Sequence, residues 1–149
     1  MQYLTNYLCN KLIDQTFRGQ SYAFPTTLEF GLFVTQPGKD GSGAEVSGPG
    51  YARVPIACSL TEFSGTQGAS TVDASSGDSG ATSNNGVIEW PSPTGEWGDV
   101  GWVAVFDAHT GGNMLMFSKF AKTKHIGHGS AGPKIKAGKF RFTIDVDWQ

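Results

Sequence analysis

The sequence predicts an all-β protein, an antiparallel β-sandwich or flattened barrel of about six to eight strands with one N-terminal amphipathic helix. The first of three supporting observations is the composition. Charged residues make up 16% of the 149-residue chain, and 21 residues are glycine, which is typical of turn-rich β-proteins. The other two are an apolar hairpin pattern over residues 97–121 and a regular alternation of apolar and polar residues over 139–148.

The hairpin pattern is expected to form the centre of the fold. Residues 101–106 read Gly-Trp-Val-Ala-Val-Phe and are apolar at nearly every position. Successive side chains of an extended chain point to opposite faces, so Val103 and Val105 share one face and the aromatic residues share the other. A strand that is apolar on both faces is covered on both. Residues 107–113 supply a turn with two glycines, and 114–121 return as the partner strand.

One helix is predicted, over residues 3–18. Its apolar side chains recur at steps of three and four residues and form a stripe, made of Leu4, Tyr7, Leu8, Leu12 and Ile13. Gly19 is a suitable C-terminal stop. A helix this short is marginal by itself, so we expect the stripe to pack either on the β domain or on another subunit.

Residues 1–149 are expected to form a single domain, whose first β half covers 26–63. Its first strand, 26–35, carries one apolar face, whereas the opposite face is mostly polar. The extended segment 51–57 contains Pro55, which has no backbone donor, so we predict an edge strand or a bulge there.

A Ser/Gly-rich segment, 64–85, separates the two β halves. Its composition cannot bury enough apolar surface to order it as a strand, so we predict a long loop. That loop is either a surface insertion or an arm that orders against a neighbour. The second β half, 86–148, is expected to contain a short strand at 87–90 and an exposed basic loop at 122–138. It ends in a half-buried strand at 139–148.

Charge and composition exclude several classes of protein. The formal net charge is −2, which argues against nucleic-acid binding. No segment approaches the roughly 20 consecutive apolar residues of a membrane-spanning helix. Cys9 and Cys58 are read as two reduced thiols. The N-terminus lacks the basic and apolar regions of a signal peptide, so synthesis in a cytoplasm is expected.

The sequence offers little for catalysis or metal binding. His125 and His128 form a His-x-x-His pair, and His109 is the third histidine, but no nearby Cys, Asp or Glu in the sequence completes a metal site. Paired carboxylates, nucleophile elbows and phosphate loops are not supported by spacing. We therefore expect no enzyme activity, no metal and no other cofactor.

The tryptophans leave a carbohydrate-binding interpretation open. Trp102 and Trp148 lie in apolar strand patterns and are expected in the core, and Trp97 is expected to anchor the entry to a strand. Trp90 precedes Pro91 and is the best candidate for an exposed ring that could stack on a sugar.

Three separated motifs carry a resemblance to a known family. They are Leu4-Thr5-Asn6-Tyr7-Leu8; Leu28-Glu29-Phe30-Gly31-Leu32-Phe33, leading to Gly50-Tyr51-Ala52-Arg53-Val54; and Gly95-Glu96-Trp97-Gly98-Asp99-Val100, followed by Thr110-Gly111-Gly112-Asn113. Over most of its length the chain resembles a family of small structural proteins of tailed bacteriophages. Members are often labelled tail-fibre proteins, and some are similar to capsid decoration (cement) proteins.

The resemblance implies a virion protein made in the host cytoplasm and offers no catalytic residues. The favoured expectation is a head decoration protein that binds the major capsid protein and stabilises the lattice, acting as a homo-oligomer, with a trimer as one option. The alternative is a tail or tail-fibre component that binds a receptor or a neighbouring tail protein. A carbohydrate-binding module is the third interpretation.

Two groups of residues are candidates for a protein–protein interface. The N-terminal group is Tyr3, Tyr7, Phe17 and Arg18, and the second group is Glu45, Tyr51 and Arg53. For the second group a purely structural role is favoured, in which Tyr51 packs and Arg53 pairs with a nearby acid.

Overall fold

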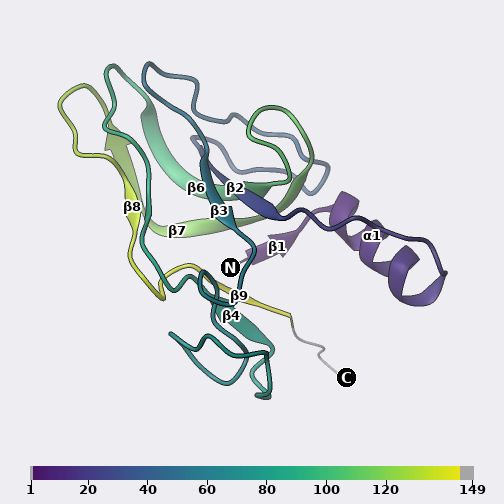
Figure 1. The fold of residues 1–149 in the computed structure, drawn as a ribbon. Helices are drawn as coiled ribbons and strands as arrows, with labels where there is room; N and C mark the ends of the chain where they lie inside the picture. The colour runs from purple at the N-terminus through teal and green to yellow at the C-terminus, as the bar shows by residue number, and fades with distance from the viewer. Residues whose placement is uncertain (1, 145–149) are drawn as a thin grey trace.

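The structure is a computed structural model that describes residues 2–144. It confirms the all-β prediction, with a five-stranded antiparallel sheet, two small two-stranded sheets and one helix (Figure 1). The strand order in the main sheet is β1-β7-β6-β2-β3. The bounds of these strands are β1 Gln2–Leu4, β2 Thr27–Phe33, β3 Val54–Ala57, β6 Gly98–Phe106 and β7 Met114–Ile126. The small sheets pair β4 (Ala81–Ser83) with β9 (Arg141–Thr143) and β5 (Ile88–Glu89) with β8 (Lys134–Ile135).

The predicted hairpin is confirmed as the centre of the main sheet. Strand β6 lies between β7 and β2 and pairs with both. The turn closes where both the backbone and the side-chain amide of Asn113 donate to the carboxylate of Asp107, at 2.7 and 2.9 Å. Gly111 and Gly112 have φ values of 61° and 70°, a region where a side chain would be strained.

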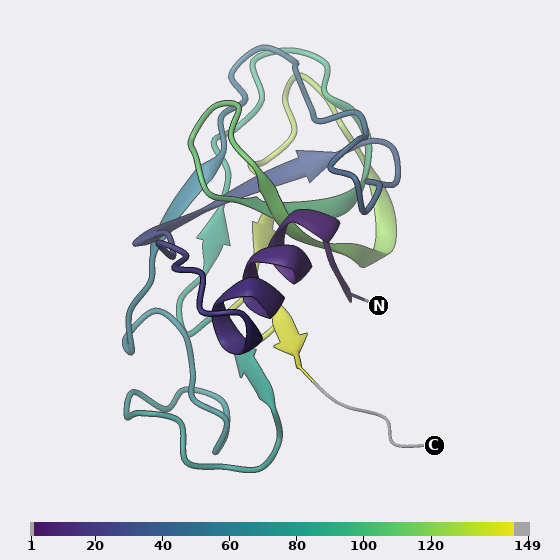
Figure 2. The same cartoon turned by 90° about the vertical axis from the view of Figure 1, so that its right-hand side faces the viewer.

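The two faces of the main sheet pack differently. Phe30 and Val105 lie on a face that, with the two small sheets, encloses the larger core. This arrangement is the predicted sandwich. Ala104 and Phe106 lie on the other face, in a smaller cluster with Phe33 and residues of β7. Helix α1 (Asn6–Phe17) lies outside the sheet, above β4 and β9 (Figure 2).

The prediction of a helix over 3–18 was wrong at its start. Residues 2–4 form strand β1, which pairs with β7, and Thr5 caps the helix. The Thr5 hydroxyl accepts a hydrogen bond from the Leu8 backbone N–H and donates one to the Met114 carbonyl. An N-cap residue has an extended, non-helical backbone, so strand β1 ends before Thr5 and the helix begins after it. Of the predicted stripe, only Leu8 is buried.

The face of the first strand that the sequence makes mostly polar is largely buried in the structure. Glu29 and Phe33 are both buried, and Phe33 belongs to the smaller core cluster. The loop 34–53 and the β6–β7 turn lie over this face, and they satisfy its polar groups. The prediction for Pro55 is confirmed, because β3 forms the edge of the main sheet.

Strand boundaries in the second half differ from the predictions. The loop predicted over 64–85 contains β4, because Ala81–Ser83 pair with β9. The basic loop predicted over 122–138 contains the end of β7 and all of β8. In the last predicted strand, Phe140 and Phe142 are buried as expected, whereas Ile144 is 66% exposed. The predictions for Val146 and Trp148 lie outside the described residues.

Candidate functional site

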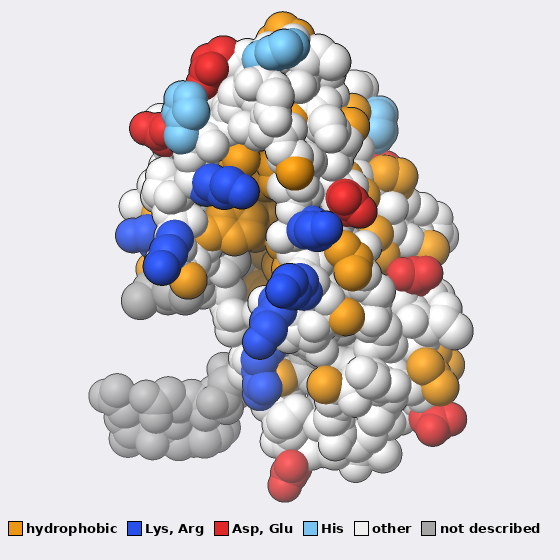
Figure 3. Space-filling model, turned by 90° about the vertical axis from the view of Figure 1, so that its left-hand side faces the viewer, with side chains coloured by type: hydrophobic (Ala, Val, Ile, Leu, Met, Phe, Trp, Pro, Cys, Tyr) orange, Lys and Arg blue, Asp and Glu red, His pale blue; other side chains and the backbone are white. Residues whose placement is uncertain are grey.

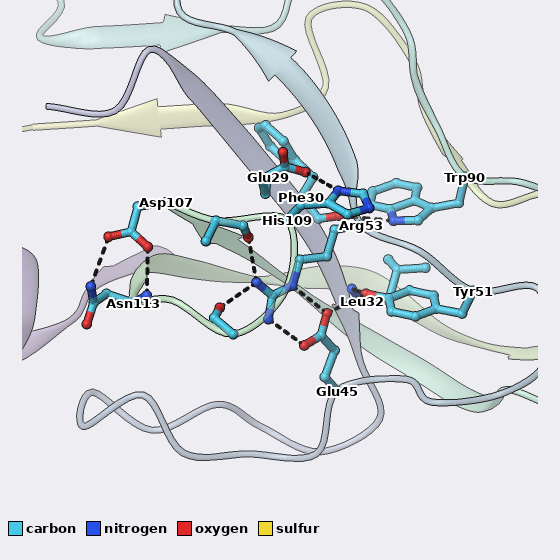
Figure 4. A network of polar contacts seen from close by, with 12 residues as sticks. Glu29, Phe30, Leu32, Glu45, Tyr51, Arg53, Trp90, Asp107, His109 and Asn113 are labelled. Atoms are coloured by element: carbon cyan, nitrogen blue, oxygen red, sulfur yellow. Dashed lines mark hydrogen bonds and ion pairs between the residues drawn. The ribbon is translucent and has the colours of Figure 1, made fainter.

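Arg53 is the centre of a polar cluster that joins two loops (Figure 4). Its Nε and Nη2 donate to the two carboxylate oxygens of Glu45, each at 2.8 Å. Its Nη1 donates to the carbonyls of Ala108 and Gly111 in the β6–β7 turn, at 2.7 and 2.8 Å. The guanidinium also lies 3.4 Å from the centre of the Phe106 ring. Arg53 therefore ties the 34–53 loop to the central hairpin.

Tyr51 completes this cluster. Its hydroxyl donates to Glu45 at 2.8 Å and accepts the backbone N–H of Leu32 at 2.9 Å. Burial raises the pKa of Tyr51 above its usual range, and the nearby Glu45 carboxylate adds to the rise. The phenol thus remains a protonated donor. The structural role favoured for this group is what the geometry shows: Tyr51 packs edge-on to Trp97, and Arg53 pairs with an acid.

His109 and Glu29 lie beside this cluster. The His109 Nδ1 is 3.0 Å from a carboxylate oxygen of Glu29, and the Glu29 side chain is 10% exposed. A shallow hollow of about 270 Å³ opens between His109 and Tyr51, with the Arg53 side chain at its base. Because every polar end of Arg53 is engaged within the chain, this hollow offers little to a ligand.

The N-terminal candidates divide between core and surface. Tyr3 stacks on Phe117 at 5.0 Å between ring centres. Tyr7 is half-buried beside Tyr22. Phe17 is 78% exposed, and Arg18 forms an exposed ion pair with Asp14 at 2.9 Å. The sequence-predicted residues thus do not form one continuous surface, and Phe17 is the apolar candidate that is exposed to solvent.

Trp90 corrects the sugar-stacking prediction. It is 1% exposed and belongs to the larger core. Its indole Nε1 donates to the Phe30 carbonyl at 3.2 Å. A ring enclosed in this way cannot stack on an external sugar. The anchor role predicted for Trp97 fits its position, because the ring is 5% exposed and its Nε1 donates to the Pro49 carbonyl at 2.8 Å.

His125 lies between two acids on the surface. Its Nδ1 is 2.8 Å from Asp99 and its Nε2 is 2.6 Å from Glu96. The hydrogen bond to Asp99, followed by the charge of Glu96, raises the pKa of His125 above 6.5. Within residues 2–144, no group of three His, Cys, Asp or Glu residues has a geometry that could hold a metal ion.

The most distinctive surface feature is a groove on the side of the sandwich between β7 and the segment 131–141 (Figure 3). It consists of two hollows of about 370 and 480 Å³, which share Phe120, Ala121 and Lys134. Its floor includes core residues such as Val100 and Val103. The sandwich is therefore open on this side, and its apolar interior reaches the groove.

The rim of the groove is basic (Figure 3). Seven of the 11 lysines and arginines of the chain line it, and all seven are exposed: Lys119, Lys122, Lys124, Lys134, Lys136, Lys139 and Arg141. No Asp or Glu lines either hollow. None of the seven forms an ion pair with another residue in the described part of the chain.

One edge of β7 is open along this groove. The strand pairs with β6 over most of its length, but β1 covers its other edge only at residues 116–118. From 119 to 126 this edge has no partner strand within residues 2–144. An open edge presents backbone N–H and C=O groups that can pair with another extended chain.

The sequence interpretation did not identify this groove, although a signal was present. Between Ala108 and Ile144 the sequence contains the seven basic residues and no Asp or Glu. The segment 122–138 is predicted from its glycines and proline to be an exposed basic loop, and a loop prediction places these charges opposite no other element. Only the pairing of β5 with β8 and of β4 with β9 brings 134–141 opposite β7.

The sequence profile of one family, described as Podophage GP4 fiber I protein gp80, matches residues 3–143. No curated protein sequence is similar enough to count as a match. None of the helices in the described residues is long and apolar enough to cross a membrane.

The family description supports the bacteriophage resemblance seen in the sequence motifs. It names a fibre protein, and so agrees better with the tail-fibre alternative than with the decoration protein that we favoured from the sequence. Because the profile covers nearly the whole chain, the protein belongs to the podophage GP4 fiber I (gp80) family, a family of phage virion structural proteins.

Proposed function

We propose that this protein is a component of a podophage tail fibre and that it acts by binding other virion proteins, not by catalysis. The family description supports the fibre assignment. The observation that carries the binding role is the groove, because it combines an apolar floor, a basic rim and an open strand edge. Exposed apolar surface bordered by charge is typical of interaction sites.

The partner that we propose is a neighbouring fibre or tail protein, in place of the major capsid protein that we favoured from the sequence. Fibres are built from repeated subunits, so contacts of modest strength add up through multivalency. Self-association as a homo-oligomer is part of this proposal. The polar cluster around Arg53 has a structural role, because it holds the 34–53 loop on the β6–β7 turn. The groove is therefore the binding site that we propose.

Locating the protein in the virion tests the fibre assignment. Antibody labelling of intact particles, followed by electron microscopy, should place the label on the tail or its fibres. Quantitative mass spectrometry should give a small copy number set by the tail symmetry, as opposed to the roughly hundreds expected of a lattice-bound head protein. Label distributed over the head would contradict the proposal and favour the decoration function.

A further inference from the structure

We propose that the groove binds the C-terminal segment, residues 145–149, of a second copy of this chain, so that subunits join head to tail. The inference rests on the proposed fibre function in one respect, namely that a fibre subunit must join a neighbour. It goes further in naming the occupant.

The chemistry of the groove favours an extended polypeptide that carries both apolar and acidic side chains. Phe120, Val103 and Phe140 supply apolar contact area. The open edge of β7 at 119–126 supplies backbone groups, and adding a strand to such an edge is a common mode of peptide recognition. An acidic polysaccharide would match the charge of the rim but would leave the apolar floor without a complementary partner.

The charge of the rim favours an acidic occupant. Seven exposed cations gathered on one side of a small domain repel each other. Lys122 and Lys134 lie on opposite walls, since Lys122 is in β7 and Lys134 in β8. Acidic side chains placed between such walls would relieve the repulsion and select the partner, since opposite charges steer association and like charges prevent it.

The C-terminal sequence has the matching pattern. Residues 145–149 read Asp-Val-Asp-Trp-Gln, so in an extended chain the two acids share one face and Val146 and Trp148 share the other. These apolar residues could enter the floor of the groove, and the acids could face the lysines. The segment contains the only acids of the chain after Asp107.

The apolar face of β9 also continues past the point where the rest of the subunit buries it. Phe140 and Phe142 are 7% exposed, whereas Ile144, the next residue on that face, is 66% exposed. This face therefore leaves the core of its own subunit at Ile144, immediately before the acidic segment.

The direction of β9 favours a neighbour over the subunit's own groove. Arg141 lines the groove, but three residues later the Ile144 N–H donates to the Gly80 carbonyl at the far end of β4. Strand β9 thus runs away from β8 (Figure 1). The described chain therefore ends at Ile144 in a direction that leads away from the groove that Arg141 lines.

Such a contact joins two different surfaces of the same protein. A heterologous contact of this kind leaves one groove and one tail free in every open complex, so subunits keep adding until a ring closes or an open filament forms. That geometry suits a repeated subunit of a fibre.

Two variants of the full-length chain test the tail and the groove separately. A chain ended after Ile144 retains the groove and lacks the tail, and Lys122→Glu/Lys134→Glu retains the tail and reverses the groove. Lys122 and Lys134 are both exposed, and thermal unfolding should confirm that each variant folds. By sedimentation velocity at about 50 mM salt, the wild-type protein should self-associate, and each variant alone should be monomeric. Their equimolar mixture should form 1:1 heterodimers, which native mass spectrometry resolves by mass.

A charge exchange gives the second test. Asp145→Lys/Asp147→Lys should weaken association with the wild-type groove more than about tenfold. Binding should return when this tail meets the Lys122→Glu/Lys134→Glu groove. The matched control, Lys11→Glu/Lys39→Glu, reverses two cations outside the groove and should associate like the wild type.

Several results would overturn the inference. Unchanged association after removal of 145–149 would exclude this tail as the occupant. If the wild-type protein is monomeric and the NMR resonances of the groove residues shift when 145–149 are removed, the tail binds the groove of its own chain. If groove reversal abolished binding to bacterial polysaccharide but not self-association, the occupant would be a glycan. None of these results would alter where antibody labelling locates the protein on the virion, so the fibre assignment stands or fails separately.

Discussion

Arg53 and Glu45 form a two-pronged ion pair, with two N–H···O contacts of 2.8 Å, and thereby connect the middle of the loop 34–53 to its end. The Arg53 side chain is 7% exposed and that of Glu45 is 25% exposed. The same guanidinium holds two carbonyls of the β6–β7 turn. One side chain therefore coordinates two loops that are far apart in sequence.

Arg53→Lys should destabilise the protein by about 2–3 kcal/mol. Lysine keeps the charge but cannot form the planar, two-pronged contact or reach both carbonyls at once, and buried acceptors left without donors are costly. Urea unfolding measures the loss. Arg18→Lys is the matched control, because its pair with Asp14 is exposed, and it should change stability by less than about 0.5 kcal/mol. Equal effects at the two sites would refute the role assigned to Arg53.

Thr5→Val should cost about 1–3 kcal/mol and loosen the start of helix α1. Valine has nearly the same shape but removes the hydroxyl that donates to the Met114 carbonyl at 2.6 Å and accepts from Leu8. Hydrogen exchange should show faster exchange of the Leu8 amide. Thr5→Ser retains the hydroxyl and should retain most of the protection. Unchanged exchange in Thr5→Val would show that the cap is unimportant.

Trp90→Ala should destabilise the protein by about 3–5 kcal/mol, because it leaves a cavity in the larger core and removes the donor to the Phe30 carbonyl. Differential scanning calorimetry at fixed pH measures the fall in Tm. Leu60→Ala removes a large apolar side chain that is 55% exposed, and it should have little effect. Wild-type stability in Trp90→Ala would restore the interpretation of Trp90 as an exposed, sugar-stacking ring.

His125 should give the folded protein a measurable pH dependence. Because its pKa is raised above 6.5 in the folded state, the stabilisation by Asp99 and Glu96 is fully present below pH 6.5. It is lost as the pH rises through the higher, folded-state pKa. NMR titration should show that raised pKa directly.

The two acids should contribute unequally to this effect. Asp99→Asn should lower the pKa of His125 more than Glu96→Gln does, since the hydrogen bond to Asp99 is the larger cause. His125→Gln should flatten the stability profile over the same pH range. A pKa at or below 6.5 in the wild-type protein would contradict the proposed ion pairs.

Local patterns in the sequence were enough to predict the β class, the central hairpin and the edge position of Pro55. Each depends on short-range rules: alternation sets which face a side chain occupies, and proline cannot donate to a neighbouring strand. The same rules placed Val103 and Val105 together in the core. The sequence also favoured a pair between Arg53 and a nearby acid, and the structure identifies that acid as Glu45, eight residues away.

Only the tertiary structure decided the fate of Trp90 and the formation of the groove. The hydrogen bond from Trp90 joins residues 60 positions apart, and that from Arg53 to Ala108 joins residues 55 apart. Periodicity within a segment carries no information about such partners. The basic residues of 119–141 lie in a stretch without acids, but they become one rim only because strand pairing brings β8 and β9 opposite β7. Short-range patterns thus determine which faces are apolar, whereas chain topology determines which of those faces remain uncovered.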